Sequence, residues 1–305
     1  MKTLSEVIKP FWQFNRPYAL IGSFIAGLSA MGLISVLTRD FTFSYLYYFF
    51  MGALCLFLAS LGIVGFNQIL DHPVDIQNKP YLPIAARQIS LKTAWFLVIG
   101  ADLLVVFISA TQGIYLFSAM IISLVLGHLY SLSALRKTTA IFWLSSTLIA
   151  FIRGVIFNIF GFLYINQKLG FFDGVPTVIW LLAFATTCIA FALAWIKDIS
   201  DVKGDEAYGY KNPATVLGVQ KTFKIALAVL FTTFALMTWL FFVDVPYINT
   251  QVLAVGNLVM ALVICRWVFA VDLNSFESAQ NFYQVVWRFY YCENVLFFLS
   301  AVLAI

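Results

Sequence analysis

Two acidic stretches of the chain have the residue types and the spacing to hold divalent cations. They cover residues 67–75 and 197–205 and, with Glu206, contain six of the 14 acidic residues. Within each stretch the polar side chains recur at intervals of three or four residues, which places them on one face of a helix. These side chains are Asn67, Asp71 and Asp75 in the first stretch, and Asp198, Asp201 and Asp205 in the second.

The chemistry that suits this set is magnesium binding. Five carboxylates that face one cavity repel each other unless cations lie between them, and Mg²⁺ prefers oxygen ligands supplied by one or two carboxylates together with substrate phosphates. We therefore predict the six side chains as metal ligands and the five aspartates as catalytic groups. Two Mg²⁺ ions that bridge a diphosphate would balance the charge of the site. The alternative is that the aspartates are ordinary solvated charges.

Two residues predict how the helices end beside the acids. Pro73 lacks a backbone donor and disfavours helix at His72, so the first helix should end or bend there and leave Asp75 at a flexible edge. Gly204 permits conformations that end helices, so the chain is expected to turn out of the second helix at this residue.

Basic side chains near both stretches have the charge that the outer oxygens of a diphosphate require. Those predicted to bind it are Lys79, Arg136 and Lys197, and further bases nearby in sequence are Arg87, Lys137 and Lys203. The excess of Lys and Arg on the cytoplasmic side of membrane proteins explains the same positions equally well.

The elements that must position these residues are membrane-spanning helices. The chain is 62% hydrophobic and 10% charged, whereas a soluble domain carries about 25% charged residues, and its mean hydropathy is +0.94. Runs of roughly 17–25 apolar residues are long enough to cross a bilayer as helices. We predict an all-α polytopic membrane protein, a single domain over 1–305 with about nine helices around a central cavity. The expected spans are 17–37, 44–66, 92–110, 112–132, 139–164, 177–196, 223–243, 247–271 and 286–305.

The charge distribution predicts the orientation. Most of the 18 basic residues fall in the N-terminal tail and after the second, fourth, sixth and eighth spans, whereas Arg39 and Lys168 lie on the opposite side. The positive-inside rule then puts the N-terminus and both acidic stretches on the cytoplasmic side. Residues 1–14 resemble neither a signal nor a transit peptide, which favours a prokaryotic plasma membrane. The lipid bilayer is the expected partner, nucleic acid is not, and the sequence leaves the oligomeric state open.

The two acidic stretches resemble the hallmarks of the UbiA superfamily of membrane prenyltransferases. Asn67, Asp71 and Asp75 match its NxxxDxxxD pattern, and residues 197–205 match its second aspartate pattern. The chain is most similar to the homogentisate prenyltransferase branch, in segments that cover most of its length. These segments are 67–85, 197–209, Leu217-Gly218, Arg153-Gly154 with Asn158, Arg16-Pro17 with Gly22, and 287–293.

The chain also departs from that branch. Tyr18 follows Arg16-Pro17 where His is common, Arg87 replaces a Gly, and the pattern that begins at Tyr130 lacks two prolines. These departures leave the metal site intact and the acceptor open.

The resemblance implies a Mg²⁺-dependent transfer of a polyprenyl group from its diphosphate to an aromatic acceptor. In this branch the acceptor is homogentisate, which loses CO₂, and the products are tocopherol and plastoquinone precursors. The implied contacts to the diphosphate or the acceptor come from Arg16, Asn67, Lys79, Tyr130, Arg136, Arg153, Asn158 and Lys197. The alternative acceptors are hydroxybenzoate, a naphthoate, chlorophyllide, haem or a glyceryl phosphate lipid. A cation-coupled membrane transporter is the alternative of another class.

Arg153 has a separate interpretation, because a charge inside a span is costly and usually faces the interior of the bundle. It either binds the carboxylate of the acceptor or shapes the site. Otherwise it forms a buried structural pair or extends to the membrane interface.

Overall fold

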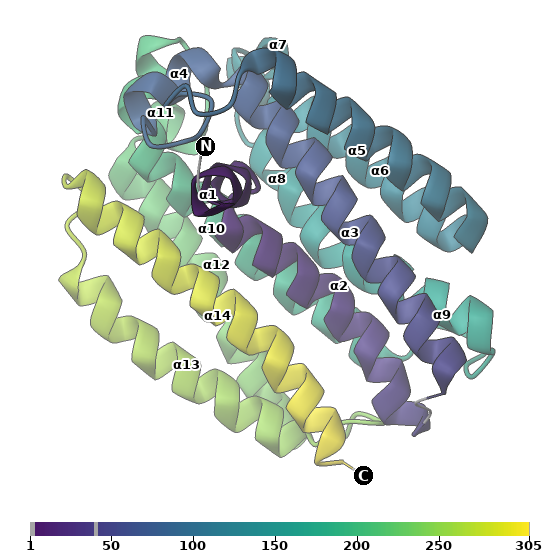
Figure 1. Ribbon diagram of the computed structural model, residues 1–305. Coiled ribbons are helices and arrows are strands. Elements are labelled where there is room, and N and C mark those ends of the chain that lie inside the picture. Colours follow the sequence, from purple (N-terminus) through teal and green to yellow (C-terminus); the bar gives the residue numbers. More distant parts are fainter. Residues whose placement is uncertain (1–3, 40–41, 305) are drawn as a thin grey trace.

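Long apolar helices make up the described part of the chain, which comprises residues 4–39 and 42–304 of the computed structural model without the side chains of residues 4–8 (Figure 1). The ends of the expected domain, Met1 and Ile305, lie outside that part. Its residues form helices and loops without strands. The long helices are α2 (Pro17–Thr38), α3 (Phe43–Leu70), α5 (Leu91–Gln112), α6 (Ile114–Ser131), α10 (Thr177–Ala207), α12 (Val219–Trp239), α13 (Thr250–Ala270) and α14 (Phe276–Val302).

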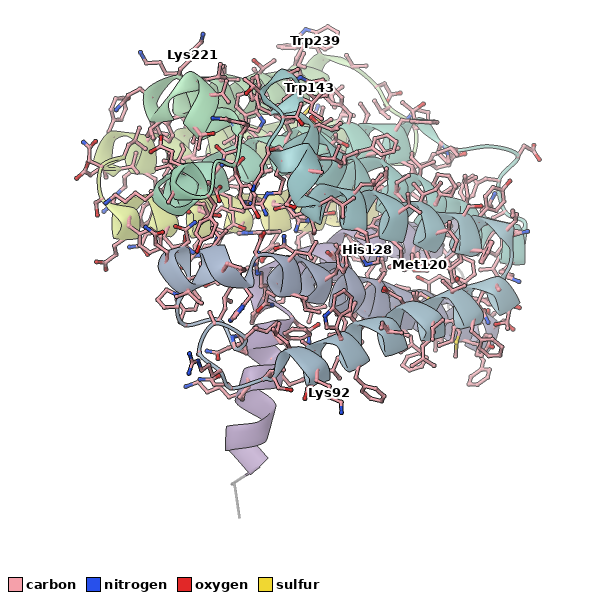
Figure 2. All side chains as sticks on the ribbon, turned by 90° about the horizontal axis from the view of Figure 1, so that it is seen from above. Lys92, Met120, His128, Trp143, Lys221 and Trp239 are labelled. Carbon is pink, nitrogen blue, oxygen red and sulfur yellow. The ribbon has the colours of Figure 1, made fainter. Side chains whose placement is uncertain are left out.

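One further span is composite. It consists of η1 (Thr139–Ile141), α8 (Leu144–Phe151), the π-helix η2 (Ile152–Phe160) and α9 (Gly161–Leu169). The remaining elements are short: α1 (Leu4–Phe14), α4 (His72–Asn78), α7 (Ser133–Arg136), α11 (Pro213–Leu217) and η3 (Leu240–Phe242). Helix α1 projects from the side of the bundle, roughly across the long helices (Figures 1 and 2).

Eight segments within the described residues are long and apolar enough to cross a membrane. They coincide with the first eight expected spans. The ninth expected span falls on α14, which packs beside α2, α10 and α13 but is not among the eight. It carries Arg288, Glu293 and Asn294, and these polar side chains lower its hydropathy. The fold is thus the expected helical membrane bundle, with α14 as its least apolar long helix.

The long helices form an inner and an outer set. Between 61% and 67% of the apolar window is buried in α2, in the composite span and in α10, against 28% in α5 and in α13. Large side chains of the outer helices, such as Phe96, Phe107 and Phe269, are exposed, as lipid-facing residues are in a bilayer. The inner helices therefore have the interior surface on which a site can be built.

Three of the short elements lie together at one end of the bundle. Figure 1 shows α4, α7 and α11 together there, close to where α10 ends. Helix α4 packs against α10, and α11 packs against α10 and α12. Both acidic stretches reach this end, because the first lies at the end of α3 and the second at the end of α10.

Candidate active site

A cavity of about 530 Å³ opens at this end of the bundle. Its outer part is lined by polar and charged side chains that include Asn67, Asp198 and Asp205. Its inner part is lined by apolar ones such as Ile149, Phe157 and Leu193. The cavity therefore offers a charged region and an apolar region to one ligand.

The first acidic stretch is divided between two helices. Helix α3 ends at Leu70, and α4 begins at His72 with Pro73 in its first turn. The predicted end of the first helix within this stretch is confirmed, and His72 itself lies in the new helix. The expected flexible edge at Asp75 is wrong. Asp75 lies within α4 and is 4% exposed, because α4 folds back against α10 instead of leading out of the bundle.

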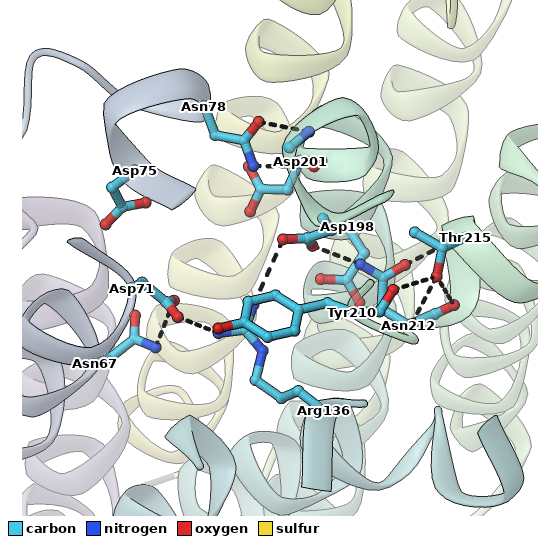
Figure 3. A network of polar contacts seen from close by, with 12 residues as sticks. Asn67, Asp71, Asp75, Asn78, Arg136, Asp198, Asp201, Tyr210, Asn212 and Thr215 are labelled. Atoms are coloured by element: carbon cyan, nitrogen blue, oxygen red, sulfur yellow. Dashed lines mark hydrogen bonds and ion pairs between the residues drawn. The ribbon is translucent and has the colours of Figure 1, made fainter. Parts of the chain in front are cut away.

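The second acidic stretch lies on one continuous helix. Helix α10 runs to Ala207, so the expected turn of the chain at Gly204 is also wrong. The physical reason for glycine here is close packing: a Cβ atom at residue 204 would come within 2.3 to 2.5 Å of the Asn78 side chain. Asn78 accepts a hydrogen bond from the Gly204 backbone N–H and donates one to the Asp201 carbonyl, both at 3.0 Å. This contact joins α4, which carries Asp75, to the second acidic stretch on α10 (Figure 3).

Four basic side chains pair with the five aspartates. Arg136 donates a hydrogen bond to Asp71 and lies 3.6 Å from Asp205. Lys79 Nζ lies 2.6 Å from Asp201 Oδ1. The remaining pairs are Lys197 with Asp198 at 2.8 Å and with Asp201 at 3.1 Å, and Arg16 with Asp75 at 3.4 Å. The predicted diphosphate ligands Lys79, Arg136 and Lys197 thus meet at one place.

This cluster has one more acidic than basic side chain, and all five aspartates are buried. Desolvation of buried ion pairs commonly offsets their mutual attraction, so such pairs are weak evidence for stability. A cluster of this kind is better explained by a charged ligand that enters the site. By contrast, Arg87, Lys203 and Glu206 are exposed and lie outside the cluster.

Arg16 reaches Asp75 from an unusual backbone conformation. Its φ is 47°, in the left-handed region, and it immediately precedes Pro17 at the start of α2. A non-glycine residue in this region is strained, and such strain often occurs at functional sites. The conformation turns the chain sharply between α1 and α2 and directs the guanidinium to the acidic stretch on α4.

Asp75, on α4, and Lys79, directly after α4, have different electrostatic environments. Burial raises the pKa of the Asp75 carboxyl above its usual range, and Arg16 and Lys79 only partly offset this effect. Burial lowers the pKa of Lys79, but Asp201 and Asp75 outweigh it, so this pKa is above its usual range. Lys79 therefore stays charged. A divalent cation near Asp75 would favour loss of the proton from the Asp75 carboxyl.

The donor set fits magnesium, although it is not a preformed cage. Among the described residues, no three Asp, Glu, His or Cys side chains converge as a ligand set, because the bases hold the aspartates apart. Mg²⁺ does not need such a cage, since it keeps several waters and binds one or two carboxylates plus phosphate oxygens. Asp198 and Asp205 of α10 line the cavity and supply such carboxylates, and Asn67 of α3 lines it beside them, whereas Asp71, Asp75 and Asp201 are not part of its lining.

Arg153 lies deeper in the same cavity. Its guanidinium is 4.8 Å from the centroid of the Trp287 ring, and within the described residues it forms no ion pair. Trp287 in turn packs on Gly22, where a Cβ atom would come within 2.2 Å of the indole. Three separate segments of the chain thus fix one unpaired cation against the cavity.

Two other predicted contacts have different environments. Tyr130 lines the cavity at the end of α6. Asn158 is buried and does not line it; its amide donates hydrogen bonds to Gly154 O at 2.7 Å and to Thr186 Oγ1 at 3.1 Å. Asn158 therefore stabilises the π-helix that carries Arg153.

Several residues of the cluster were missed in the sequence. Tyr210 lies under the Arg136 guanidinium, 4.1 Å from its ring centroid. Asn212 donates a hydrogen bond to Asp205 at 2.6 Å, and Ser146 donates one to Asp198 at 3.3 Å. The one available signal was the position of Tyr210 and Asn212 just after the second acidic stretch, while Ser146 had none.

Comparisons with known proteins agree with this site. The sequence profile of the UbiA prenyltransferase family matches residues 19–299. A homogentisate phytyltransferase from Synechocystis sp. is 28% identical over 298 residues, 96% of each chain. A homogentisate solanesyltransferase from Arabidopsis thaliana is 30% identical over 300 residues, 94% of this chain and 75% of the relative. Among solved structures, a UbiA homolog from Archaeoglobus fulgidus bound to GPP and Mg²⁺ has a TM-score of 0.66 at 17% identity, covering 96% of this chain and 99% of that one; this likeness shows the fold.

The close packing of Asn78 on Gly204 predicts that Gly204→Ala destabilises the fold. The added methyl group displaces Asn78 and breaks its hydrogen bonds to α10, which should lower the free energy of unfolding by about 1–3 kcal/mol. The matched control is Gly100→Ala on α5, where nothing lies within 4 Å of the position that the new methyl group takes and alanine is the better helix former by up to about 1 kcal/mol. Thermal unfolding of the purified variants measures both effects; a Gly204 variant as stable as the Gly100 variant contradicts the packing role.

Proposed function

The chain belongs to the UbiA prenyltransferase family, and from that premise we propose that it transfers a polyprenyl group from its diphosphate to homogentisate, with loss of CO₂. The observation that carries this proposal is the cluster of five buried aspartates and four bases, of which Asp198, Asp205 and all four bases line the charged end of a cavity whose inner end is apolar. The two relatives above are named as homogentisate prenyltransferases, and this supports the choice of acceptor.

In this proposal the diphosphate binds among the charged side chains. The cluster has four basic side chains against five acidic ones, so it does not neutralise a diphosphate by itself. Asn67 and the five aspartates would hold Mg²⁺, two ions being enough to neutralise the diphosphate and the cluster. Bound Mg²⁺ supplies Lewis-acid stabilisation of the charge on the leaving diphosphate. Lys79, Arg136, Lys197 and Arg16 are then free to donate hydrogen bonds to its outer oxygens.

The transfer step breaks the bond between the prenyl carbon and the diphosphate oxygen, and the electron pair leaves with the diphosphate. The acceptor ring attacks the allylic cation, a carbon–carbon bond forms, and the ring loses a proton. Loss of the acceptor's carboxylate as CO₂ leaves a methylene carbon that takes up a proton and becomes a methyl group. The helices around the cavity exclude water that would otherwise quench the cation, and rings such as Tyr130 present π faces to the positive charge.

The acceptor is proposed to bind near Arg153. Arg153 follows Ser146, the partner of Asp198, by seven residues, which is about 10 Å along a helix. An unpaired guanidinium that far inside an apolar cavity needs an anionic partner, and the carboxylate of homogentisate supplies one. Trp287 and Gly22 hold the guanidinium in position. The other carboxylate-bearing acceptors would satisfy it too, whereas a cation-coupled transporter does not fit the family.

The proposed orientation places the charged end of the cavity on the cytoplasmic side. Lys and Arg residues are more numerous at this end of the bundle than at the other end, and cytoplasmic loops of membrane proteins carry such an excess. A water-soluble acceptor and the released diphosphate would then exchange with the cytoplasm, while the prenyl chain lies between the helices.

The aspartates provide the first test. Membranes that contain the protein should convert labelled homogentisate and a prenyl diphosphate to a decarboxylated, prenylated quinol in Mg²⁺ but not in EDTA. Asp71→Asn and Asp198→Asn should each lower kcat at least about a hundredfold, because a neutral amide cannot replace a carboxylate that stabilises charge in the transition state. Asp244→Asn, at an exposed loop position, is the matched control. Unchanged turnover in both cluster variants would refute the assignment.

Arg153 provides the test of the acceptor site. Arg153→Gln should raise KM for homogentisate about tenfold to a hundredfold, because a hydrogen bond to a charged group contributes roughly 1.5–3 kcal/mol. KM for the prenyl diphosphate should change little, since Arg153 lies outside the aspartate cluster. Arg288→Gln, on the exposed face of α14, is the control. Equal changes in the two KM values would show that Arg153 is structural.

A further inference from the structure

Helix α1 is attached to the bundle only near its end. Among its described side chains, Phe14 alone is buried, and its ring packs on Gly65 of α3. Lys9, Phe11 and Trp12 are exposed, with 37% of Phe11 and 48% of Trp12 uncovered by protein. The rest of α1 extends away from the bundle (Figure 2). Two aromatic side chains of this helix are therefore available to another partner.

The sequence of α1 has the pattern of an amphipathic helix. Positions 4, 7, 8 and 11 are apolar, and these intervals of three or four residues are typical of one apolar helix face. Lys9 and Phe11 are two residues apart, which is about 200° around the helix axis, so they point in nearly opposite directions. Trp12 lies between those two directions. Helices that lie where lipid meets water have this combination of a charged face, an apolar face and an aromatic residue between them.

A helix of this length needs such a partner in order to form. Helix α1 has 11 residues, and isolated helices shorter than about 12–15 residues are marginal in water even when they are rich in alanine. Pro10 also lies inside α1 and removes one backbone donor from its hydrogen bonds. Burial of the apolar face in another phase supplies the stabilisation that the sequence alone lacks.

The level and direction of α1 identify that phase. Helix α2, which follows it, has 22 residues and is about 33 Å long, close to the roughly 30 Å of the hydrocarbon layer of a bilayer. Pro17, the first residue of α2, therefore lies near one boundary of that layer. Helix α1 ends three residues earlier and runs roughly across the long helices (Figures 1 and 2). It thus follows the boundary between acyl chains and head groups.

We propose that α1 binds the lipid surface at the charged end of the bundle. In this proposal Phe11 lies among the acyl chains, Trp12 lies at the level of the head groups, and Lys9 faces water. The proposal requires that the bundle spans a membrane and is independent of the prenyl donor and the acceptor.

Photo-crosslinking identifies the partner of α1. The full chain carries p-benzoylphenylalanine in place of Phe11 and is irradiated in nanodiscs of phosphatidylcholine and phosphatidylglycerol. Mass spectrometry should detect a phospholipid adduct. The same replacement of Phe107, which is 71% exposed on α5, is the positive control. Replacement of Tyr208 is the negative control, because it follows the 31 residues of α10, about 46 Å of helix, and lies beyond the bilayer. A covalent dimer at residue 11, or no lipid adduct there beside one at residue 107, would overturn the proposal.

Cysteine labelling tests the orientation of α1 with smaller changes. Lys9→Cys and Phe11→Cys are treated in the same nanodiscs with a charged, membrane-impermeant maleimide. Wild type is the blank, since its four cysteines all lie in long helices. Lys9→Cys should react at least about tenfold faster than Phe11→Cys, because a charged reagent does not enter the acyl layer that covers the apolar face. The two rates should become equal in SDS. Equal rates in nanodiscs would show that lipid does not cover Phe11 and would contradict the proposal.

Discussion

Five buried carboxylates share one end of the bundle with the four bases that pair with them, and the arrangement of the other elements follows from this constraint. Helix α4 turns back after Leu70 so that Asp75 faces the second stretch on α10. Asn78 and Gly204 close the contact between the two helices, and Tyr210 lies against Arg136. Buried ion pairs add little net stability, and this is a reason to propose that the cluster binds a cationic ligand.

The membrane-spanning helices extend the cavity from this charged cluster into an apolar region. Inner helices form the walls, and the outer ones separate those walls from lipid. The π-helix η2 brings two different side chains to the cavity, with Arg153 nearer the aspartates and Phe157 at the inner end. π-helical segments often occur at functional sites, and the hydrogen bonds of Asn158 stabilise this one. One short segment of the backbone therefore bears on both the proposed acceptor and the proposed prenyl chain.

The sequence was sufficient for the helical membrane bundle and for most of the charged cluster. The spacing of the aspartates predicted shared helix faces. Lys79 and Arg136, which were predicted to lie near these aspartates, pair with Asp201 and Asp71. Local rules failed where tertiary contacts decide. Gly204 was expected to end a helix, because its role depends on Asn78, more than a hundred residues away in sequence. Asn158 was expected to contact the substrate, because nothing in the local sequence reveals that its amide donates hydrogen bonds to the backbone of η2.

The most direct test is the equilibrium binding of geranylgeranyl diphosphate to purified protein without acceptor, measured in Mg²⁺ and in EDTA. The account predicts tight binding in Mg²⁺, weak binding in EDTA, and loss of the difference in Asp198→Asn but not in Asp244→Asn. The reason is that the four bases of the cluster already pair with its five aspartates, so a diphosphate that arrives without cations is not neutralised there. Equal affinity in Mg²⁺ and EDTA would contradict the account, because the four bases would then bind the diphosphate unaided and the aspartates would have no part in it.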